Sequence, residues 1–83
     1  MELSFINVGF GNVVARDRVI AVVTPDTAPI KKLKDMARQN AKLIDASQGR
    51  RTRAVLVMDS DHVILSATTM ETILQRLRGE SEK

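Results

Sequence analysis

The chain has 83 residues, which indicates one small domain because domains usually contain roughly 100–150 residues. It has no cysteine and one histidine, His62, so disulfides, thiolate metal sites and multi-histidine metal sites are excluded. No apolar run approaches the ~20 residues of a membrane span, and the first residues show no signal-peptide pattern. The formal net charge is +3, and we expect a soluble, cytoplasmic and moderately basic protein.

In chain order, the predicted elements are two strands, a helix, three strands and a helix (ββαβββα), which form one α+β domain over residues 1–79. Apolar runs bounded by turn residues predict the strands, at residues 3–8, 13–24, 43–46, 54–58 and 63–67. Apolar residues at helical spacing predict helices over residues 28–40 and from Thr69, the expected N-cap, to Gly79. Residues 80–83 are expected to form a flexible tail.

Turn and cap residues support these boundaries. Gly9-Phe10-Gly11-Asn12 predicts a turn after the first strand, and Asp59-Ser60-Asp61 predicts a hairpin turn between the last two strands. Asp26 or Thr27 is available as the N-cap of the first helix. The predicted order of elements therefore has turn chemistry at the points where the chain must reverse.

The central strands lack the alternation of apolar and polar residues that is typical of a sheet with one solvated face. Residues 19–23, 54–58 and 63–65 are apolar on both faces. If all five strands form one sheet, two short helices can cover only one of its faces. The sequence therefore predicts a homo-oligomer, in which a second copy covers the other face.

Residue patterns for catalysis, metal binding or nucleotide binding are weak. His62 follows the turn at residues 59–61, whose aspartates suit a metal or acid–base site, but also a turn bonded to its own backbone. The glycines of residues 9–11 resemble a dinucleotide fingerprint, yet Val14 stands where it needs glycine. Residues 49–52 lack the spacing and the lysine of a P-loop. We therefore expect no enzyme, cofactor, metal or small-molecule substrate.

Positive charge is concentrated in the middle of the chain. Residues 31–53 carry eight basic and two acidic side chains, a net charge of +6, whereas the other residues carry five basic and eight acidic ones, a net charge of −3. Such segregation is typical of proteins that bind polyanions. The basic residues of this segment are Lys31, Lys32, Lys34, Arg38, Lys42, Arg50, Arg51 and Arg53.

The strongest part of this segment is the arginine cluster after Gly49, where guanidinium groups can bind phosphate oxygens in bidentate geometry. Arg50, Arg51 and Arg53 lie in it, and the hydroxyl of Thr52 can add a contact. The lysines of the predicted helix are also compatible with an ordinary solvated face.

The scarcity of aromatic residues favours duplex DNA over RNA as the partner. Phe5 and Phe10 are the only aromatic residues, and both are expected in the core or in a turn. Readers of single-stranded RNA usually stack bases on aromatic side chains, whereas arginines can bind the duplex DNA backbone without them. Two alternatives stay open: a small RNA-binding protein, and a scaffold module whose basic patch binds an acidic protein.

Four stretches resemble the RemA family of bacterial extracellular-matrix regulatory proteins: FINVGFGN at residues 5–12, APIKK at 28–32, GRRTRA at 49–54 and MDSDHVILS at 58–66. The resemblance extends from about Leu3 to Leu77 without a shift in spacing. It implies a DNA-binding transcriptional activator of biofilm-matrix and osmoprotection operons. It also implies a subunit similar to LytTR-type DNA-binding domains, assembled into octameric rings against which DNA is bent.

The resemblance also implies that Arg18, Arg50 and Arg51 contact DNA. From the residues themselves we add Arg53, Thr52, Lys31 and Lys32 as expected DNA contacts. The expected partner is double-stranded DNA, and the expected location is the nucleoid.

The chain departs from the family pattern at three places. Arg16-Asp17 stands where a small residue and Asn are expected, Gln48 where an aromatic is expected, and Met70 where proline is expected. These departures bear on the choice of DNA targets more than on DNA binding itself.

Overall fold

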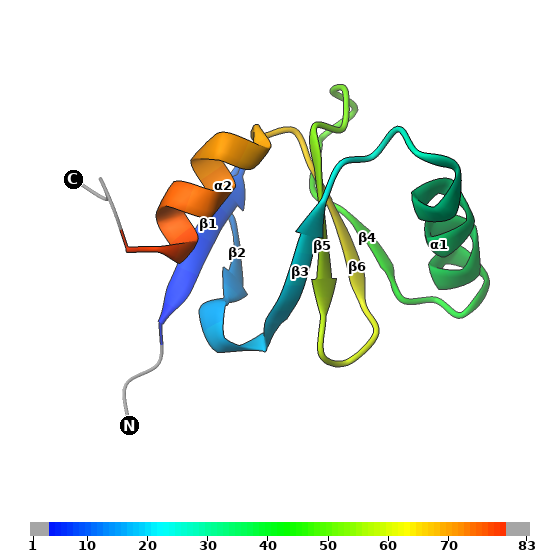
Figure 1. The fold of residues 1–83 in the computed structure, drawn as a ribbon, viewed down its shortest axis with the longest axis horizontal. Coiled ribbons are helices and arrows are strands. Elements are labelled where there is room, and N and C mark those ends of the chain that lie inside the picture. The colour runs from blue at the N-terminus through cyan, green and yellow to red at the C-terminus, as the bar shows by residue number, and fades with distance from the viewer. Residues whose placement is uncertain (1–3, 80–83) are drawn as a thin grey trace.

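A four-stranded sheet lies at the centre of the computed structural model, which describes residues 4–79 (Figure 1). The strands are β1 (Phe5–Gly9), β2 (Asn12–Ala15), β3 (Val19–Val23), β4 (Leu43–Asp45), β5 (Ala54–Met58) and β6 (Val63–Ser66). The helices are α1 (Ala28–Gln39) and α2 (Met70–Leu77), with a 3₁₀ turn, η1, at Arg16–Arg18. The predicted α+β class is confirmed, whereas the predicted start at Leu3 and the predicted tail 80–83 lie outside the described residues.

The second predicted strand, residues 13–24, is wrong as a single element because η1 divides it into β2 and β3. β2 pairs with β1, and β3 pairs with β5 in a different sheet. The charged triplet at Arg16–Arg18 lies where the chain passes between the sheets, and Asp17 and Arg18 are exposed. Because such side chains are costly to bury, the chain bends here and the order becomes βββαβββα.

The strands form two sheets rather than the predicted single sheet of five. The larger has the order β3-β5-β6-β4, in which β4 and β6 are parallel and the other pairs are antiparallel. β1 and β2 form a separate antiparallel hairpin. The tight turn between β5 and β6 confirms the hairpin predicted at residues 59–61, and Asp61 has a φ of 71° there.

Both faces of the larger sheet are covered within one chain, as Figure 1 shows. α1 packs on one face, where its buried Ala37 joins a core formed with Val55, Val63 and Leu65. The β1–β2 hairpin and α2 cover the other face, and that core contains Ile6, Val8, Ala46, Ala54, Leu56, Met58, Ile64 and Ile73.

β5 and β6 are therefore buried on both faces, as their composition predicted. The sheet has no uncovered face that a second copy must fill, because the β1–β2 hairpin and α2 cover it. The homo-oligomer stays a prediction and needs other support.

The helices begin and end close to their predicted limits. Thr27 is the N-cap residue of α1, and Thr69 caps α2 by accepting the Thr72 N–H at 3.4 Å. After α2, Gly79 has a φ of +80°, a left-handed conformation that favours glycine at a helix end. Within residues 4–79, neither helix is long and apolar enough to cross a membrane.

Candidate nucleic-acid interface

Residues 47–53, the arginine loop, connect β4 to β5 and project from one end of the larger sheet. The loop begins with a tight turn, in which the Arg50 N–H donates to the Ser47 carbonyl at 3.0 Å. Gln48 and Gly49 have φ values of 57° and 78°, and positive φ at both central residues is the pattern of a type I′ turn. Glycine suits this position because a side chain is strained there.

Hydrogen bonds anchor the loop at both ends. Asp45 accepts the Ser47 N–H at 2.9 Å as well as the Ser47 hydroxyl, and Ser47 is buried. These bonds lower the pKa of Asp45 below its ordinary value because they favour the carboxylate. At the other end, the Arg53 N–H donates to the Ser66 carbonyl at 2.8 Å. The arginine side chains therefore extend from a backbone that the sheet holds in place.

Two loop arginines have weak contacts within the chain. The guanidinium carbon of Arg50 lies 5.8 Å from the centre of the Phe10 ring. Arg51 lies 3.9 Å from a carboxylate oxygen of Asp26, and both side chains are about three-quarters exposed. Exposed ion pairs of this kind contribute little energy. The two guanidinium groups are therefore accessible to an external anion.

The arginine loop shares its end of the molecule with the first turns of both helices (Figure 1). α1 follows β3, whose last residue pairs with Val55, and α2 follows β6, whose last residue pairs with Ala54. Helix N-termini carry a partial positive charge that favours anions. Lys31 and Lys32 are exposed near the start of α1, while Asp26 and Glu71 add negative charge at this end.

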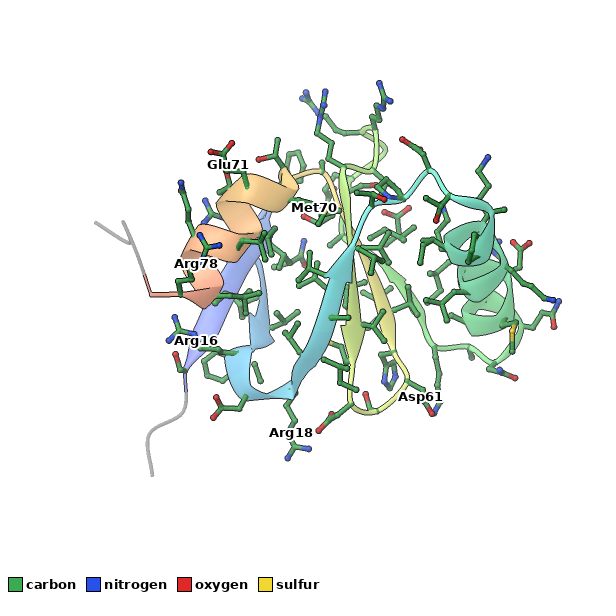
Figure 2. The ribbon with its side chains drawn as sticks, in the orientation of Figure 1. Arg16, Arg18, Asp61, Met70, Glu71 and Arg78 are labelled. Atoms are coloured by element: carbon green, nitrogen blue, oxygen red, sulfur yellow. The ribbon has the colours of Figure 1, made fainter. Side chains whose placement is uncertain are left out.

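Arg18 does not join this group. Figure 2 shows it at the opposite end of the sheet from Met70 and Glu71, which start α2. Its guanidinium lies 3.2 Å from Asp59, in the β5–β6 turn, and 67% of its side chain is exposed. Arg53 and Asp59 flank β5, which places their Cα atoms about 20 Å apart at about 3.4 Å per residue.

Of the predicted contacts, one chain thus brings together Arg50, Arg51, Thr52 and Arg53, with Lys31 and Lys32 on the adjoining helix. Thr52 is half-buried, and the three arginines are exposed. Thr52 also borders a shallow hollow of 220 Å³ between the loop and residues 24–26.

The departures from the family pattern have local structural roles. A guanidinium nitrogen of Arg16 donates to the Arg76 carbonyl at 2.9 Å, near the end of α2, so this added charge is used within the subunit. Gln48 occupies the first left-handed position of the loop turn. Met70 is the first residue of α2 and packs against the core, so the helix begins without proline.

His62 is part of the β5–β6 turn, where its Nδ1 lies 2.7 Å from the Ser60 hydroxyl. This contact agrees with the interpretation of residues 59–61 as a turn. In the part of the chain that the structure describes, no three His, Cys, Asp or Glu side chains are grouped as a metal site.

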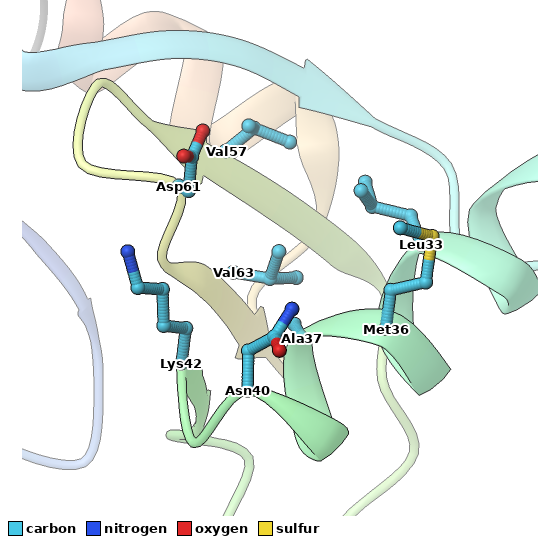
Figure 3. Close-up of a pocket in the computed structure, with 8 residues that line it drawn as sticks. All are labelled: Leu33, Met36, Ala37, Asn40, Lys42, Val57, Asp61 and Val63. Carbon is cyan, nitrogen blue, oxygen red and sulfur yellow. The ribbon is translucent and has the colours of Figure 1, made fainter.

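A cavity of 590 Å³ lies between α1 and the larger sheet (Figure 3). Apolar side chains of both elements form most of its wall, and polar groups lie at one end. The lining residues are Leu33, Met36, Ala37, Asn40, Lys42, Val57, Asp61 and Val63. The amine of Lys42 donates to the Ser60 carbonyl at 3.1 Å. The cavity is separate from the arginine loop, and no sequence motif predicted it.

The two aromatic residues, expected in the core or in a turn, differ in outcome: Phe10 lies in the predicted turn, whereas Phe5 is on β1 and outside the core. Phe5 and Phe10 are 55% and 53% exposed, so neither belongs to the core. Phe10 does lie in the predicted turn, between two glycines, and a large side chain in such a turn often points outward. Its proximity to Arg50 had no signal in the sequence because the two residues lie far apart in the chain, in the β1–β2 turn and in the loop before β5.

Comparison with known proteins gives a consistent result over nearly the whole chain. A family model described as RemA-like, extracellular matrix regulatory protein A-like, matches residues 5–77. The chain is 56% identical over 82 residues to a protein of Oceanobacillus iheyensis, covering 99% of this chain and 95% of that protein. It is 60% identical over 80 residues to a Halothermothrix orenii protein, with 96% and 95% covered. A Carboxydothermus hydrogenoformans protein is 58% identical over 83 residues, with 100% and 95% covered. All three bear the name of regulatory proteins.

Proposed function

The chain belongs to the RemA-like family of regulatory proteins, and from this premise we propose that it is a transcriptional regulator that binds duplex DNA through the arginine loop. The observation that carries the proposal is the anchored loop turn, from which Arg50, Arg51 and Arg53 extend into solvent. The start of α1, with Lys31 and Lys32, adds positive potential beside it.

In this proposal the loop binds the DNA backbone and does not read bases through a recognition helix. Each arginine can donate two parallel hydrogen bonds to one phosphate, and the hydroxyl of Thr52 can donate a further one. Selectivity then comes from the shape and deformability of the DNA. Binding through phosphates releases counterions, so the affinity falls steeply as salt is added.

We further propose that the subunit, as a LytTR-type domain, assembles into a ring of eight copies. Support comes from large apolar side chains that are about half or more exposed in the described residues, among them Val13, Ile20, Met36 and Ile44. β3 and β4 are the edges of the larger sheet, and exposed edges are common sites of association. A ring repeats the arginine loop, so weak contacts on each subunit add up through effective concentration.

The oligomer also gives Arg18 a role. Within one subunit, Arg18 lies at the end opposite the arginine loop. In the proposed ring, both Arg18 and the arginine loop are repeated in every subunit, so a bound DNA can meet copies of each. In this proposal, the protein is cytoplasmic and nucleoid-associated, and it activates biofilm-matrix and osmoprotection operons. A scaffold role for the basic patch, or RNA binding, would replace this function if duplex DNA is not bound.

The first test measures duplex DNA affinity against salt concentration by fluorescence anisotropy for the wild type and Arg50→Ala/Arg51→Ala. We expect the double variant to lose most of its affinity because up to two phosphate contacts per bound subunit disappear. The negative slope of log affinity against log salt should become shallower by about 0.9 for each lost contact.

The matched control is Lys34→Ala/Arg38→Ala, which removes the same charge from α1 without touching the loop. It should change the slope much less, and sedimentation should show the same assembly for all three proteins. Arg18→Ala reports separately on the other end of the subunit. Wild-type protein that ignores duplex DNA, or a loop variant that binds as well as the wild type, contradicts the proposal, and stronger binding of single strands favours the RNA alternative.

A further inference from the structure

The tip of the β1–β2 hairpin, residues 9–12, has an unusual backbone. Gly9, Phe10 and Gly11 have successive φ values of 108°, 54° and 79°, all in the left-handed region. Glycine adopts this region readily, but a bulky aromatic residue rarely does. Phe10 is also 53% exposed, so burial in the core does not compensate for its strained backbone. A strained residue held at an exposed tip is a candidate for a functional role.

Contacts with the rest of the chain fix this tip in place. The Val8 carbonyl accepts hydrogen bonds from the hydroxyls of Ser66, at 2.7 Å, and Thr68, at 3.3 Å. A Cβ atom on Gly9 would lie 3.0 Å from the Thr68 hydroxyl, so the backbone approaches this segment closely. The tip is thereby tied to the end of β6, beside the strand that the arginine loop enters.

At this position the Phe10 ring lies under the Arg50 guanidinium, 5.8 Å from its carbon to the ring centre. The contact joins the tip of one sheet to a loop of the other. A guanidinium held over a ring face by a cation–π contact keeps the N–H groups that point away from the ring free to donate to a phosphate.

We propose that Phe10 is a positioning residue for Arg50: its ring holds the guanidinium in the orientation that binds a DNA phosphate. This inference rests on the proposed function and adds the hairpin tip as a second segment of the interface. Phe10 acts through Arg50 and is not itself a DNA contact. The ring restricts the conformations of the long and exposed Arg50 side chain before DNA binds. Less conformational entropy is therefore lost on binding.

The test compares duplex DNA affinities of the wild type, Phe10→Leu, Phe10→Tyr, Arg50→Ala and Phe10→Leu/Arg50→Ala at one salt concentration. Leucine keeps an apolar side chain but removes the ring, and we expect a loss of about two- to fivefold, which is the range of an exposed cation–π contact. Phe10→Tyr keeps the aromatic ring, so this variant should bind duplex DNA with the wild-type affinity. In the Arg50→Ala background, Phe10→Leu should have no further effect.

The salt dependence separates positioning from a lost contact. Phe10→Leu should keep the wild-type slope because Arg50 still reaches the phosphate, whereas Arg50→Ala should make the negative slope shallower by about 0.9 per phosphate contact. Phe5→Leu is the matched control, since Phe5 is the other exposed aromatic residue of the same hairpin and lies away from the tip. It should not change the affinity of an intact oligomer.

Three results would overturn the inference: an unchanged affinity of Phe10→Leu, an equal loss in the Arg50→Ala background, or no rescue by tyrosine. The second would mean that Phe10 contacts DNA directly. Proton NMR of the DNA-free protein gives an independent readout, because the ring shifts the Arg50 side-chain resonances and Phe10→Leu should abolish that shift. If the wild type fails to bind duplex DNA but this shift is present, the proposed function fails while the contact stands.

Discussion

At the scale of single residues, the arginine loop owes its shape to a carboxylate and a serine rather than to its arginines. Asp45 accepts two hydrogen bonds from Ser47, and the turn at Gln48 and Gly49 follows directly. The ion pairs of Arg51 with Asp26 and of Arg18 with Asp59 are largely exposed and hold little in place. The residues proposed to contact DNA and the residues that hold the loop in shape are therefore different.

The role of Asp45 predicts a pH dependence of stability. Its pKa is lowered by the Ser47 hydrogen bonds, so the carboxylate stabilises the folded state above the unfolded pKa of about 3.8. This stabilisation is lost as the pH falls through the lower folded pKa. The free energy of unfolding of Asp45→Asn should therefore lie furthest below that of the wild type at neutral pH, and the gap should close in acid.

Urea unfolding followed by circular dichroism from pH 7 to pH 2 measures this gap. Asp17→Asn is a suitable control because Asp17 is an exposed aspartate with no hydrogen-bond partner for its side chain in residues 4–79. A gap for Asp45→Asn that stays constant across this range would show that the carboxylate charge does not support the loop.

At the scale of elements, capping residues and a charged triplet decide where helices and strands begin. Thr27 and Thr69 both occupy N-cap positions, but only Thr69 accepts a backbone N–H with its side chain. At Arg16–Arg18, three charged residues end one sheet and start the next. The two N-cap threonines therefore contribute differently to stability, because their side chains make different contacts.

The two caps form a matched pair for a stability test. Thr69→Ala should lower the free energy of unfolding by about 1 kcal/mol because it removes the partner of the Thr72 N–H. Thr27→Ala should cost clearly less, since no such bond is lost. Urea denaturation at neutral pH measures both variants, and equal losses would mean that the Thr69 side chain contributes nothing as a cap.

At the scale of the whole molecule, one chain covers both faces of its larger sheet and still exposes large apolar side chains. Val13 lies on the outer face of the hairpin, Ile20 on the edge strand β3 and Ile44 on the edge strand β4, and they are 58%, 65% and 48% exposed. Because the subunit has its own cores, disrupting an assembly through these residues should leave the subunit folded.

Because the cores of the subunit are separate from these exposed apolar residues, a charge placed at one of them should disturb assembly and not folding. Among Val13→Glu, Ile20→Glu and Ile44→Glu, at least one should lower the mass found by sedimentation while the circular dichroism spectrum is kept. That variant should also bind DNA more weakly because fewer arginine loops act together. Wild-type protein that sediments as a monomer, or three variants that assemble like the wild type, would contradict an oligomer built on these surfaces.

Elements that depend on neighbouring residues could be predicted from the amino-acid sequence. Helical spacing predicted α1 and α2, the aspartates at residues 59–61 predicted the β5–β6 turn, and arginines after Gly49 predicted a basic loop. These predictions hold because spacing, capping and turn chemistry act over a few residues.

The contacts between distant segments became known from the three-dimensional structure. It separated the β1–β2 hairpin from the larger sheet, placed Arg18 at the end opposite the arginine loop, and brought Phe10 beneath Arg50. The apolar residues of a strand predict that it is buried. They do not predict which strand it pairs with, because many strands have the same pattern of apolar residues. The sequence therefore shows the charges of the proposed interface one by one, and the fold determines which of them lie together.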